Sequence, residues 1–344
     1  MSDSLHVGMV LPFSGPGGQY GPSAQAVTEL AIEDINATGG ILGRKLSPVW
    51  IDGGRSPAVV AHDVRRMLDG GSLDAISGWH TSAIREALAP LAAGSIPYVY
   101  PALYEGGETA SRVLCTGETP DLQIIPAIRW LRDHKGAQRW GLVGDDYVWP
   151  RKTATVLEQQ ANELGISIEQ QWFVPQEQAT TPRELTRICD EMKQHRLQGL
   201  LILMVGQNAA RFNREFSKHL QLSGIARFCP LMDENTLLAS GAKSTKRLFT
   251  AGGYFASLTT EDSLDLNERF TRTLGETAPI LSTTAESCYE GLLALRALLS
   301  QQAPAPISYH GPRGAVSLGS NTRQTIYIAQ VHHYDFEILD CIAQ

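Results

Sequence analysis

Short apolar segments alternate with amphipathic segments along most of this chain, and this alternation limits the fold more than any other feature. Apolar runs of about four to eight residues separated by amphipathic helices are typical of parallel sheets covered by helices on both faces. In a first series the sequence predicts strands at 6–13, 46–51, 73–78 and 96–100, and helices at 22–36, 57–68 and 82–93. Within the first helix Ala24, Val27, Ala31 and Ile35 recur at helical spacing.

A second series of the same kind follows. Its predicted helices are 120–134, 150–164, 182–194 and 207–220, and its strands 140–144, 168–173, 200–205, 227–232 and 248–255. Two helices, 262–274 and 282–300, then follow without a strand between them, and the chain ends in predicted strands at 314–318, 325–332 and 336–342. A simple tandem of two α/β halves does not need this helix pair or the antiparallel tail.

This order of elements predicts an α/β protein with two doubly wound, Rossmann-like lobes. If the helix pair returns to the first half, the chain crosses between lobes more than once and forms a multi-crossing hinge. We expect such a hinge to let the lobes close on a ligand.

The charge of the chain bears on its partners. Lysine and arginine number 29 against 36 acidic residues, a net charge of -7. A protein that binds nucleic acid without regard to sequence needs a basic face, so we expect no direct nucleic-acid binding. The longest apolar stretch, 200–205, is too short to span a bilayer.

The five cysteines lie far apart, at positions 115, 189, 229, 288 and 341. None has the spacing of a metal site, so we expect structural thiols, no metal and no cofactor. This usage favours a reducing compartment. The first residues lead directly into a predicted strand without a signal peptide, which predicts a cytoplasmic protein, or a periplasmic one if a leader has been removed.

Motifs for the common α/β enzymes are missing from the sequence. There is no G-x-G-x-x-G after a strand, no P-loop, no H-E-x-x-H and no G-x-S-x-G. Adjacent carboxylates such as Asp145 and Asp146 suit shared acid–base work poorly. We therefore expect a protein that is not an enzyme, with an α/β enzyme kept as an alternative because such folds host many activities.

Two segments carry a resemblance to a known family. Residues 7–15, VGMVLPFSG, resemble the first strand and ligand loop of type I periplasmic binding proteins of the Leu/Ile/Val-binding group. Residues 31–44, AIEDINATGGILGR, are similar to that group's helix and glycine-rich turn. The resemblance extends over essentially the whole chain and implies a two-lobed fold that closes on a small polar ligand. It implies a first lobe at 1–118 plus 256–326 and a second at 119–255 plus 327–344.

Other loops resemble one branch of that group. Residues 100–106, YPALYEG, and 144–151, GDDYVWPR, look like loops of AmiC-type amide sensors and urea-binding proteins, with Trp149 where a tyrosine is usual. Residues 254–257 and 311–314 resemble two further segments of that branch. The resemblance implies a cytoplasmic amide-type sensor of gene expression with an antiterminator-type partner. The alternative is the substrate-binding component of an ABC transporter for amino acids, amides or urea, with a permease as partner; a homo-oligomer stays open.

The resemblance also implies a set of ligand-binding residues for a short-chain amide, a urea-like compound or an amino acid. They are Trp79, Thr81, Ser82, Tyr100, Tyr104, Tyr147, Trp149 and Gly206. We add Asp233, where this chain departs from the small hydroxyl residues that the amide branch tends to have. Hydroxyls at a strand-to-helix junction would bind polar ligand atoms, and aromatic rings would cover its apolar part. Some of these residues have a structural alternative, because Ser82 and Asp233 suit helix N-caps and Tyr100 suits a core strand. The carboxylate of Asp233 would also suit a ligand that carries an ammonium group.

Overall fold

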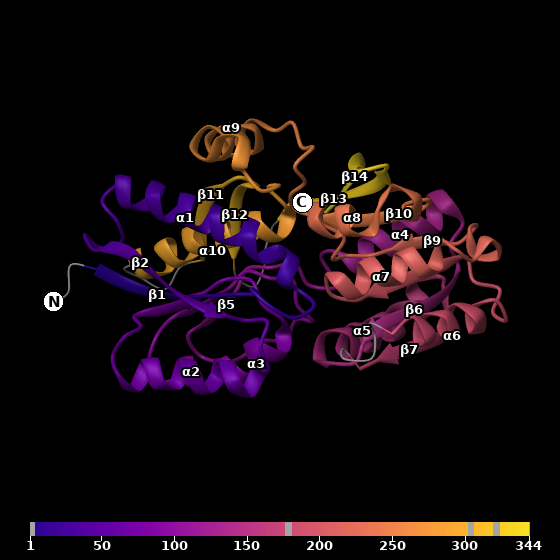
Figure 1. Cartoon of the computed structure of the whole chain (residues 1–344), viewed down its shortest axis with the longest axis horizontal. Helices are drawn as coiled ribbons and strands as arrows, with labels where there is room; N and C mark the ends of the chain where they lie inside the picture. Colours follow the sequence, from indigo (N-terminus) through magenta and orange to yellow (C-terminus); the bar gives the residue numbers. More distant parts are fainter. Residues whose placement is uncertain (1–3, 176–180, 302–305, 319–323, 344) are drawn as a thin grey trace. The chain divides into compact units, whose positions relative to one another are not determined.

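The computed structural model describes residues 4–175, 181–301, 306–318 and 324–343. The chain folds into two compact units, whose elements are labelled in Figure 1. Unit 1 comprises Met1–Gly117 and Leu258–Gln324, and unit 2 comprises Glu118–Ser257 and Thr325–Gln344. These ranges lie close to the expected lobes, and the chain passes between the units at three places, after Gly117, Ser257 and Gln324.

Unit 1 contains a parallel five-stranded sheet in the order β2-β1-β3-β4-β5. The strands are β1 (Ser4–Leu11), β2 (Lys45–Asp52), β3 (Ala75–Ser77), β4 (Tyr98–Tyr100) and β5 (Val113–Cys115). Figure 1 shows α1 (Gly21–Ala37) and α10 (Thr283–Ser300) over one face, and α2 (Pro57–Asp69) and α3 (Ser82–Ala92) over the other. Strand β1 lies between β2 and β3 and is buried along most of its length, which explains its continuous apolar run.

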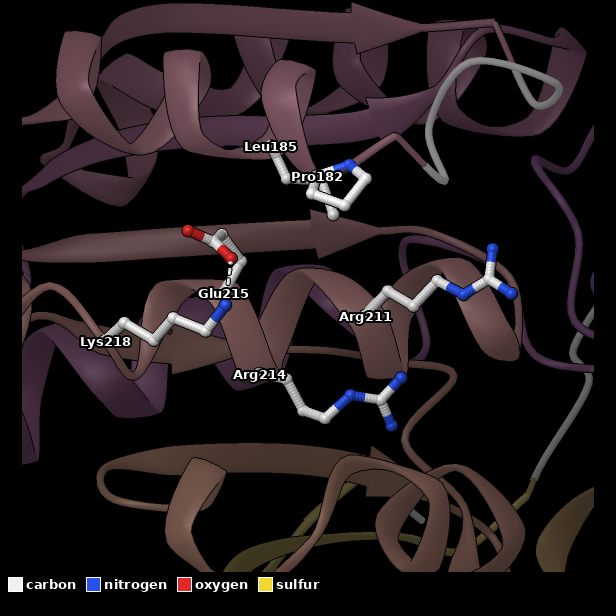
Figure 2. A pocket seen from close by; sticks show the side chains of 6 residues that line it. All are labelled: Pro182, Leu185, Arg211, Arg214, Glu215 and Lys218. Atoms are coloured by element: carbon white, nitrogen blue, oxygen red, sulfur yellow. Dashed lines mark hydrogen bonds and ion pairs between the residues drawn. The ribbon is translucent and has the colours of Figure 1, made fainter.

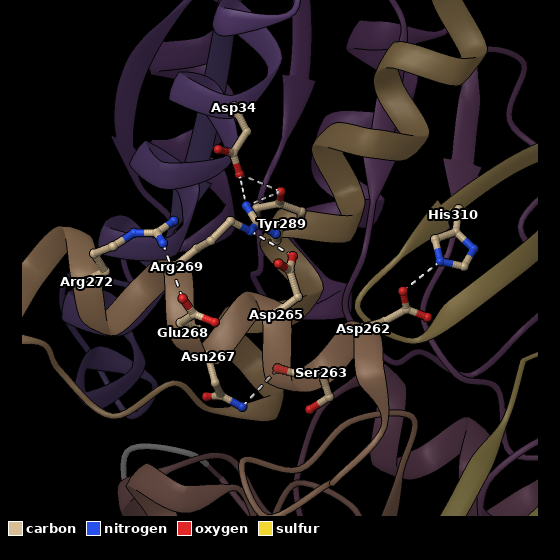
Figure 3. A network of polar contacts seen from close by, with 10 residues as sticks. All are labelled: Asp34, Asp262, Ser263, Asp265, Asn267, Glu268, Arg269, Arg272, Tyr289 and His310. Carbon is tan, nitrogen blue, oxygen red and sulfur yellow. Dashed lines mark hydrogen bonds and ion pairs between the residues drawn. The ribbon is translucent and has the colours of Figure 1, made fainter.

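Helix α9 (Glu261–Leu274) is joined to α1 and α10 by polar contacts (Figure 3). The guanidinium of Arg269 pairs with the carboxylate of Asp34, which also accepts a hydrogen bond from the Tyr289 hydroxyl at 2.7 Å. At the start of α9, Asp262 lies 2.7 Å from Nε2 of His310. The helix pair therefore belongs to the first half of the fold, as the order of elements predicts.

A two-stranded hairpin, β11 (Ile307–Gly311) and β12 (Gly314–Leu318), lies against α10. Nε of Arg313 lies 2.7 Å from Oε2 of Glu286, and both side chains are buried. The hydroxyl of Tyr309 donates to Glu290 at 2.8 Å. Burying a charged group costs much less free energy when the group is paired and hydrogen-bonded, as these buried groups are.

Unit 2 contains a seven-stranded sheet in the order β14-β13-β10-β9-β8-β6-β7. Its strands are β6 (Arg139–Asp145), β7 (Ser167–Val174), β8 (Gly199–Leu203), β9 (Ala226–Phe228), β10 (Leu248–Gly252), β13 (Ile326–His332) and β14 (Asp335–Ala343). Its helices are α4 (Ile124–Lys135), α5 (Val148–Leu164), α6 (Pro182–Met192), α7 (Gln207–Phe216) and α8 (Glu234–Ser240). Strands β13 and β14 pair antiparallel and extend an otherwise parallel sheet at the β10 edge.

The predicted elements differ from the structure mainly at short elements and at their ends. The predicted elements do not include β5, β11 or α8, which have three, five and seven residues, although Asp233 before α8 is expected as a helix N-cap. The predicted strand 227–232 ends at Phe228, and the helix predicted from 120 begins at Ile124. Gln123 is the N-cap of this helix, and its side-chain Nε2 donates to the Ala251 carbonyl at 2.7 Å.

Among the described residues, no helix combines the length and the apolar character needed to cross a lipid bilayer.

Candidate functional site

Each sheet has a point where the strand order reverses, and such switch points are where doubly wound sheets bind ligands. In unit 1 the chain goes from β1 to β2 on one side and then crosses back to β3 on the other. In unit 2 it goes from β6 to β7 and then crosses back to β8. The predicted site residues follow strands at or beside these two points.

The loop after β3 is pressed against β1 and begins with a residue that has to be glycine. Gly78 has a φ of +111°, and a Cβ there would lie 2.5 Å from the carbonyl oxygen of Val10. The next residue, Trp79, is buried, with its ring 4.9 Å from that of Tyr20 in an edge-to-face arrangement. Trp79 thus lies at the switch point, where its side chain is packed in the interior of unit 1.

His80 fastens this loop to its neighbours. The carbonyl of Val10 can only accept, so the imidazole donates from Nδ1 to it at 3.1 Å, and Nε2 accepts from the Tyr98 hydroxyl at 2.5 Å. Burial lowers the pKa of His80 to about 3, so the ring is neutral at physiological pH. Tyr100 is buried as well, and its hydroxyl donates to the His80 carbonyl at 2.7 Å.

Thr81, and not Ser82, occupies the N-cap position of α3, which corrects the capping alternative given for Ser82. The Thr81 side chain makes no capping hydrogen bond and is half-buried. Ser82 is buried, and its Oγ accepts from Nη1 of Arg85 at 3.3 Å. The hydroxyl of Thr81 and the first N–H groups of α3 therefore form a hydrogen-bonding edge at the switch point.

Arg85, one turn along α3, ties the loop after β4 to the loop after β3. Nη2 of Arg85 lies 2.8 Å from Glu105, and Nε lies 2.9 Å from Glu108. Burial raises the pKa of Glu105, but hydrogen bonds from Arg85 and Ser82 outweigh it and leave that pKa below its usual value. The guanidinium also lies 5.3 Å from the ring centre of Tyr104, which is half-buried beside the network.

In unit 2 the buried carboxylate of Asp145 joins the two strands that flank the switch point. It accepts from the backbone N–H of Val205 at 2.9 Å and from Nδ2 of Asn208 at 3.0 Å. Gly206, between these two partners, has φ 48° and ψ -111° and is the N-cap of α7. Asp145 therefore sets the conformation of the turn that contains Gly206.

Two aromatic residues follow β6 at the same edge. Tyr147 is the N-cap of α5 and is half-buried, whereas Trp149 in the first turn is 1% exposed. Nε1 of Trp149 is buried and has no hydrogen-bond partner within the described part of the chain. A buried donor without an acceptor costs about 1–3 kcal/mol, so this indole is ready to donate to a bound group.

Asp233 follows β9 and is buried at the start of α8. Its Oδ1 accepts from the backbone N–H of Thr236 at 2.9 Å, which confirms the expected N-cap role. The neighbouring Glu234 accepts from the backbone N–H of Ala256. Thr236, Leu237 and Ser240 are buried as well, so α8 packs against the unit along its length.

The structure thus groups the predicted residues by unit. Trp79, Thr81 and Ser82 follow β3, with Ser82 the first residue of α3, and Tyr104 follows β4. Tyr100 is the last residue of β4 and is buried, as its core-strand alternative predicts. Tyr147, Trp149, Gly206 and Asp233 lie after β6, β8 and β9. Sequence reasoning missed the roles of His80, Arg85 and Asp145. The spacing of Arg85, three residues after Ser82 on a predicted helix, was the available signal.

The thiols offer no reactive group at these loops. Burial raises the pKa of Cys115, Cys189, Cys229 and Cys288 to about 12, so these thiols stay protonated at physiological pH. Across residues 4–175, 181–301, 306–318 and 324–343, no group of three or more His, Cys, Asp or Glu side chains is placed to hold a metal ion.

Comparison with known proteins agrees with this architecture. A family model described as periplasmic binding protein matches residues 4–323. A branched-chain amino acid transporter substrate-binding protein of Streptococcus pneumoniae, solved with isoleucine, aligns with TM-score 0.84 and 16% identity over 99% of this chain and 100% of its own. A solute-binding protein of an ABC transporter from R. palustris, solved with benzoate, aligns with TM-score 0.81 and 18% identity over 99% and 96%.

A leucine-binding protein of Thermotoga maritima aligns with TM-score 0.80 and 15% identity over 98% of this chain and 99% of its own. At such identities these likenesses show the fold, which is that of type I periplasmic binding proteins, as the sequence predicts. The match of the family model over nearly the whole chain shows the family: this chain belongs to the periplasmic binding protein family.

Proposed function

We propose that this protein is the solute-binding component of an ABC importer, and that it binds one small polar solute without transforming it. The observation that supports the proposal is that Thr81 follows β3 and Tyr147 follows β6, the strands at the switch points, with the other predicted ligand residues at the same or neighbouring strands. The structural neighbours are solute-binding proteins of ABC transporters, and the family consists of binding proteins. These neighbours support the importer alternative better than the gene-regulatory sensor.

The solute is proposed to draw donors and acceptors from both units. In unit 1 the Thr81 hydroxyl and the start of α3 suit a carboxylate or a carbonyl oxygen, because helix N-termini attract partial negative charge. In unit 2 the indole N–H of Trp149 suits an acceptor, and Tyr147 adds an aromatic face. Because the solute is proposed to bind the closed form more tightly than the open form, binding shifts the population toward the closed form.

The solutes seen in the neighbours set the order in which ligands are tested. Isoleucine and benzoate, found in two of them, both carry a carboxylate. Amino acids and aromatic carboxylates are therefore the first proposed classes. Short amides and urea are the second, because residues 100–106 and 144–151 resemble the loops of the amide- and urea-binding branch.

The proposal also has consequences for partners and location. An importer's binding component delivers its solute to a permease, so an ABC permease is the proposed partner and the outer side of the membrane the proposed location. The cytoplasmic expectation belongs to the sensor, whose partner would be an antiterminator. Fractionation of cells that express the natural gene separates the two, since the importer predicts the protein in the periplasmic or surface fraction.

A thermal-shift screen with the purified full chain tests the binding function. Solutes at 100 times Kd should add about 2.7 kcal/mol to the stability of the unit they bind, which corresponds to roughly 5–10 °C. We expect a shift with an amino acid or aromatic carboxylate, and no chemical change in the recovered solute. A shift with amides or urea alone would move the protein to that branch, and conversion of the solute would contradict a pure binding role.

A further inference from the structure

A pocket of about 240 Å³ lies between α6 and α7 in unit 2, on residues that the solute-binding loops do not use (Figure 2). It is lined by Pro182, Leu185, Arg211, Arg214, Glu215 and Lys218. Three of these six side chains are cationic and one is anionic. Leu185 and Glu215 are buried, whereas Pro182, Arg214 and Lys218 are exposed.

The single carboxylate in this pocket is already neutralised. Glu215 accepts from Nζ of Lys218 at 2.7 Å and from the Thr186 hydroxyl at 2.9 Å. Burial raises the pKa of Glu215, but these hydrogen bonds outweigh it and keep that pKa below its usual value. Lys218 and Glu215 therefore cancel, and the charge that the pocket offers comes from the two arginines.

Arg211 and Arg214 lie one turn apart on α7, and Figure 2 shows their side chains extending in the same direction. Arg211 makes one long contact, from Nη2 to Oε1 of Gln207 at 3.4 Å. Arg214 donates from Nη1 to the carbonyl of Ala239 and is thereby held in place. Within the described residues, most N–H groups of both guanidiniums have no hydrogen-bond partner, and two such forks suit a carboxylate well.

The start of α6 adds to this field from the opposite wall. Pro182 is the first residue of the helix, and the N-cap Thr181 makes no side-chain capping hydrogen bond. The positive end of the helix dipole therefore has no side-chain cap next to the arginines, and the acidic residue of the first turn, Glu184, is paired with Arg187. Pro182 and Leu185 give the same wall an apolar surface, which suits the methylene groups beside a carboxylate.

The size and openness of the pocket decide between a free ligand and a side chain. Pockets for small ligands have about 300–1,000 Å³ and enclose most of the ligand. This one is smaller, and three of its lining residues are exposed. It has room for one acidic side chain that projects from a larger surface.

We propose that the pocket between α6 and α7 is a docking site for an acidic segment of a partner protein, with an Asp or Glu carboxylate held by Arg211 and Arg214. The net charge of the whole chain is -7, so the molecule as a whole repels an acidic peptide. Binding of such a peptide therefore reports a local site.

The test uses the full chain and a fluorescein-labelled hexaglutamate peptide, followed by fluorescence anisotropy at low and at physiological salt. We expect saturable binding that weakens as salt rises. R211Q/R214Q should weaken it at least about tenfold, since it removes both charge-assisted contacts. The matched control is R65Q/R129Q, which removes the same charge from exposed positions on α2 and α4 and should leave binding unchanged.

Several outcomes would overturn the docking site. They are the absence of peptide binding, an equal loss in both double variants, and displacement of the peptide by inorganic phosphate at the peptide's own concentration, which would indicate a small-anion site. The solute response in the thermal-shift screen provides the separate readout. R211Q/R214Q should retain this solute response. Failure of the peptide to bind would therefore not contradict the proposed solute-binding function. Equally, the absence of a solute response would not contradict the docking site.

Discussion

Nε2 of His80 and the hydroxyl of Tyr98 lie 2.5 Å apart in the interior of unit 1, and both residues are fully buried. The hydrogen bond holds the loop after β3 to β4, while Nδ1 of the same ring holds it to β1. The position of the edge at Thr81 thus depends on a neighbouring side chain that is itself buried in the unit. We regard His80 as a positioning residue.

Tyr98→Phe removes the donor and leaves Nε2 of His80 buried without a partner. We expect a loss of about 1–3 kcal/mol in the free energy of unfolding, measured in urea. The control is Tyr334→Phe, at a residue 54% exposed, which should change stability by less than about 0.5 kcal/mol. Equal stability of the two variants would show that the buried bond contributes nothing.

The neutral state of His80 predicts a pH dependence. In the folded protein the pKa of His80 is lowered to about 3, whereas in the unfolded chain it is near 6.5. Below pH 6.5 the unfolded state binds a proton that the folded state does not, so this stability is present above 6.5 and is lost as pH falls toward 3. The slope is up to about 1.4 kcal/mol per pH unit.

Urea unfolding at pH 7, 6, 5 and 4.5 compares the natural chain with His80→Gln. Carboxylates contribute to the acid loss in both proteins, so the difference between their slopes isolates the histidine. We expect the natural chain to lose stability more steeply below pH 6.5. Parallel curves would mean that the imidazole is protonated in the folded state as well.

The buried pair of Arg85 and Glu105 predicts a larger effect. Arg85→Met leaves the Glu105 carboxylate, whose side chain is 0% exposed, without its countercharge. Breaking a buried pair from one side costs about 3–5 kcal/mol. Arg187→Met, which removes exposed pairs on α6, should cost less than about 1 kcal/mol. A double-mutant cycle with Glu105→Met measures the coupling, and a coupling near zero would contradict the geometry.

The contacts of α9 predict a smaller effect. Asp34→Ala removes the carboxylate that both Arg269 and Tyr289 contact (Figure 3). This site is partly exposed, so we expect a loss of about 0.5–1.5 kcal/mol. In the Asp34→Ala variant, amide hydrogen exchange should be faster in residues 261–274 than elsewhere in unit 1. Uniform exchange rates would indicate that α9 is held by its apolar face alone.

Much of the fold could be predicted from the sequence because long elements carry periodic signals. Helix α1 and strand β1 are examples, since their apolar residues repeat over more than one turn or run without interruption. Strand β5, with three residues at a sheet edge, is too short for any period, and it follows Arg112 at a φ of +67°. Such elements depend on tertiary pairing, which the local sequence does not encode.

The sequence predicts which loops form the candidate site, but it does not predict the directions in which their side chains point. The motifs place Tyr100 and Tyr104 on one loop, yet the structure turns the Tyr100 hydroxyl inward to the His80 carbonyl. Asp145 stands in a quoted motif, but its link to Asn208 spans 63 positions. Contacts of that range arise from strand order, and strand order is not visible in a single sequence.

The most direct test of solute binding at both switch points is calorimetric titration with the solute that gives the greatest thermal shift. The natural chain is compared with Thr81→Ala in unit 1 and Tyr147→Ala in unit 2. We predict that each substitution weakens binding at least about tenfold, with circular dichroism spectra unchanged. Natural affinity in both variants would contradict the account.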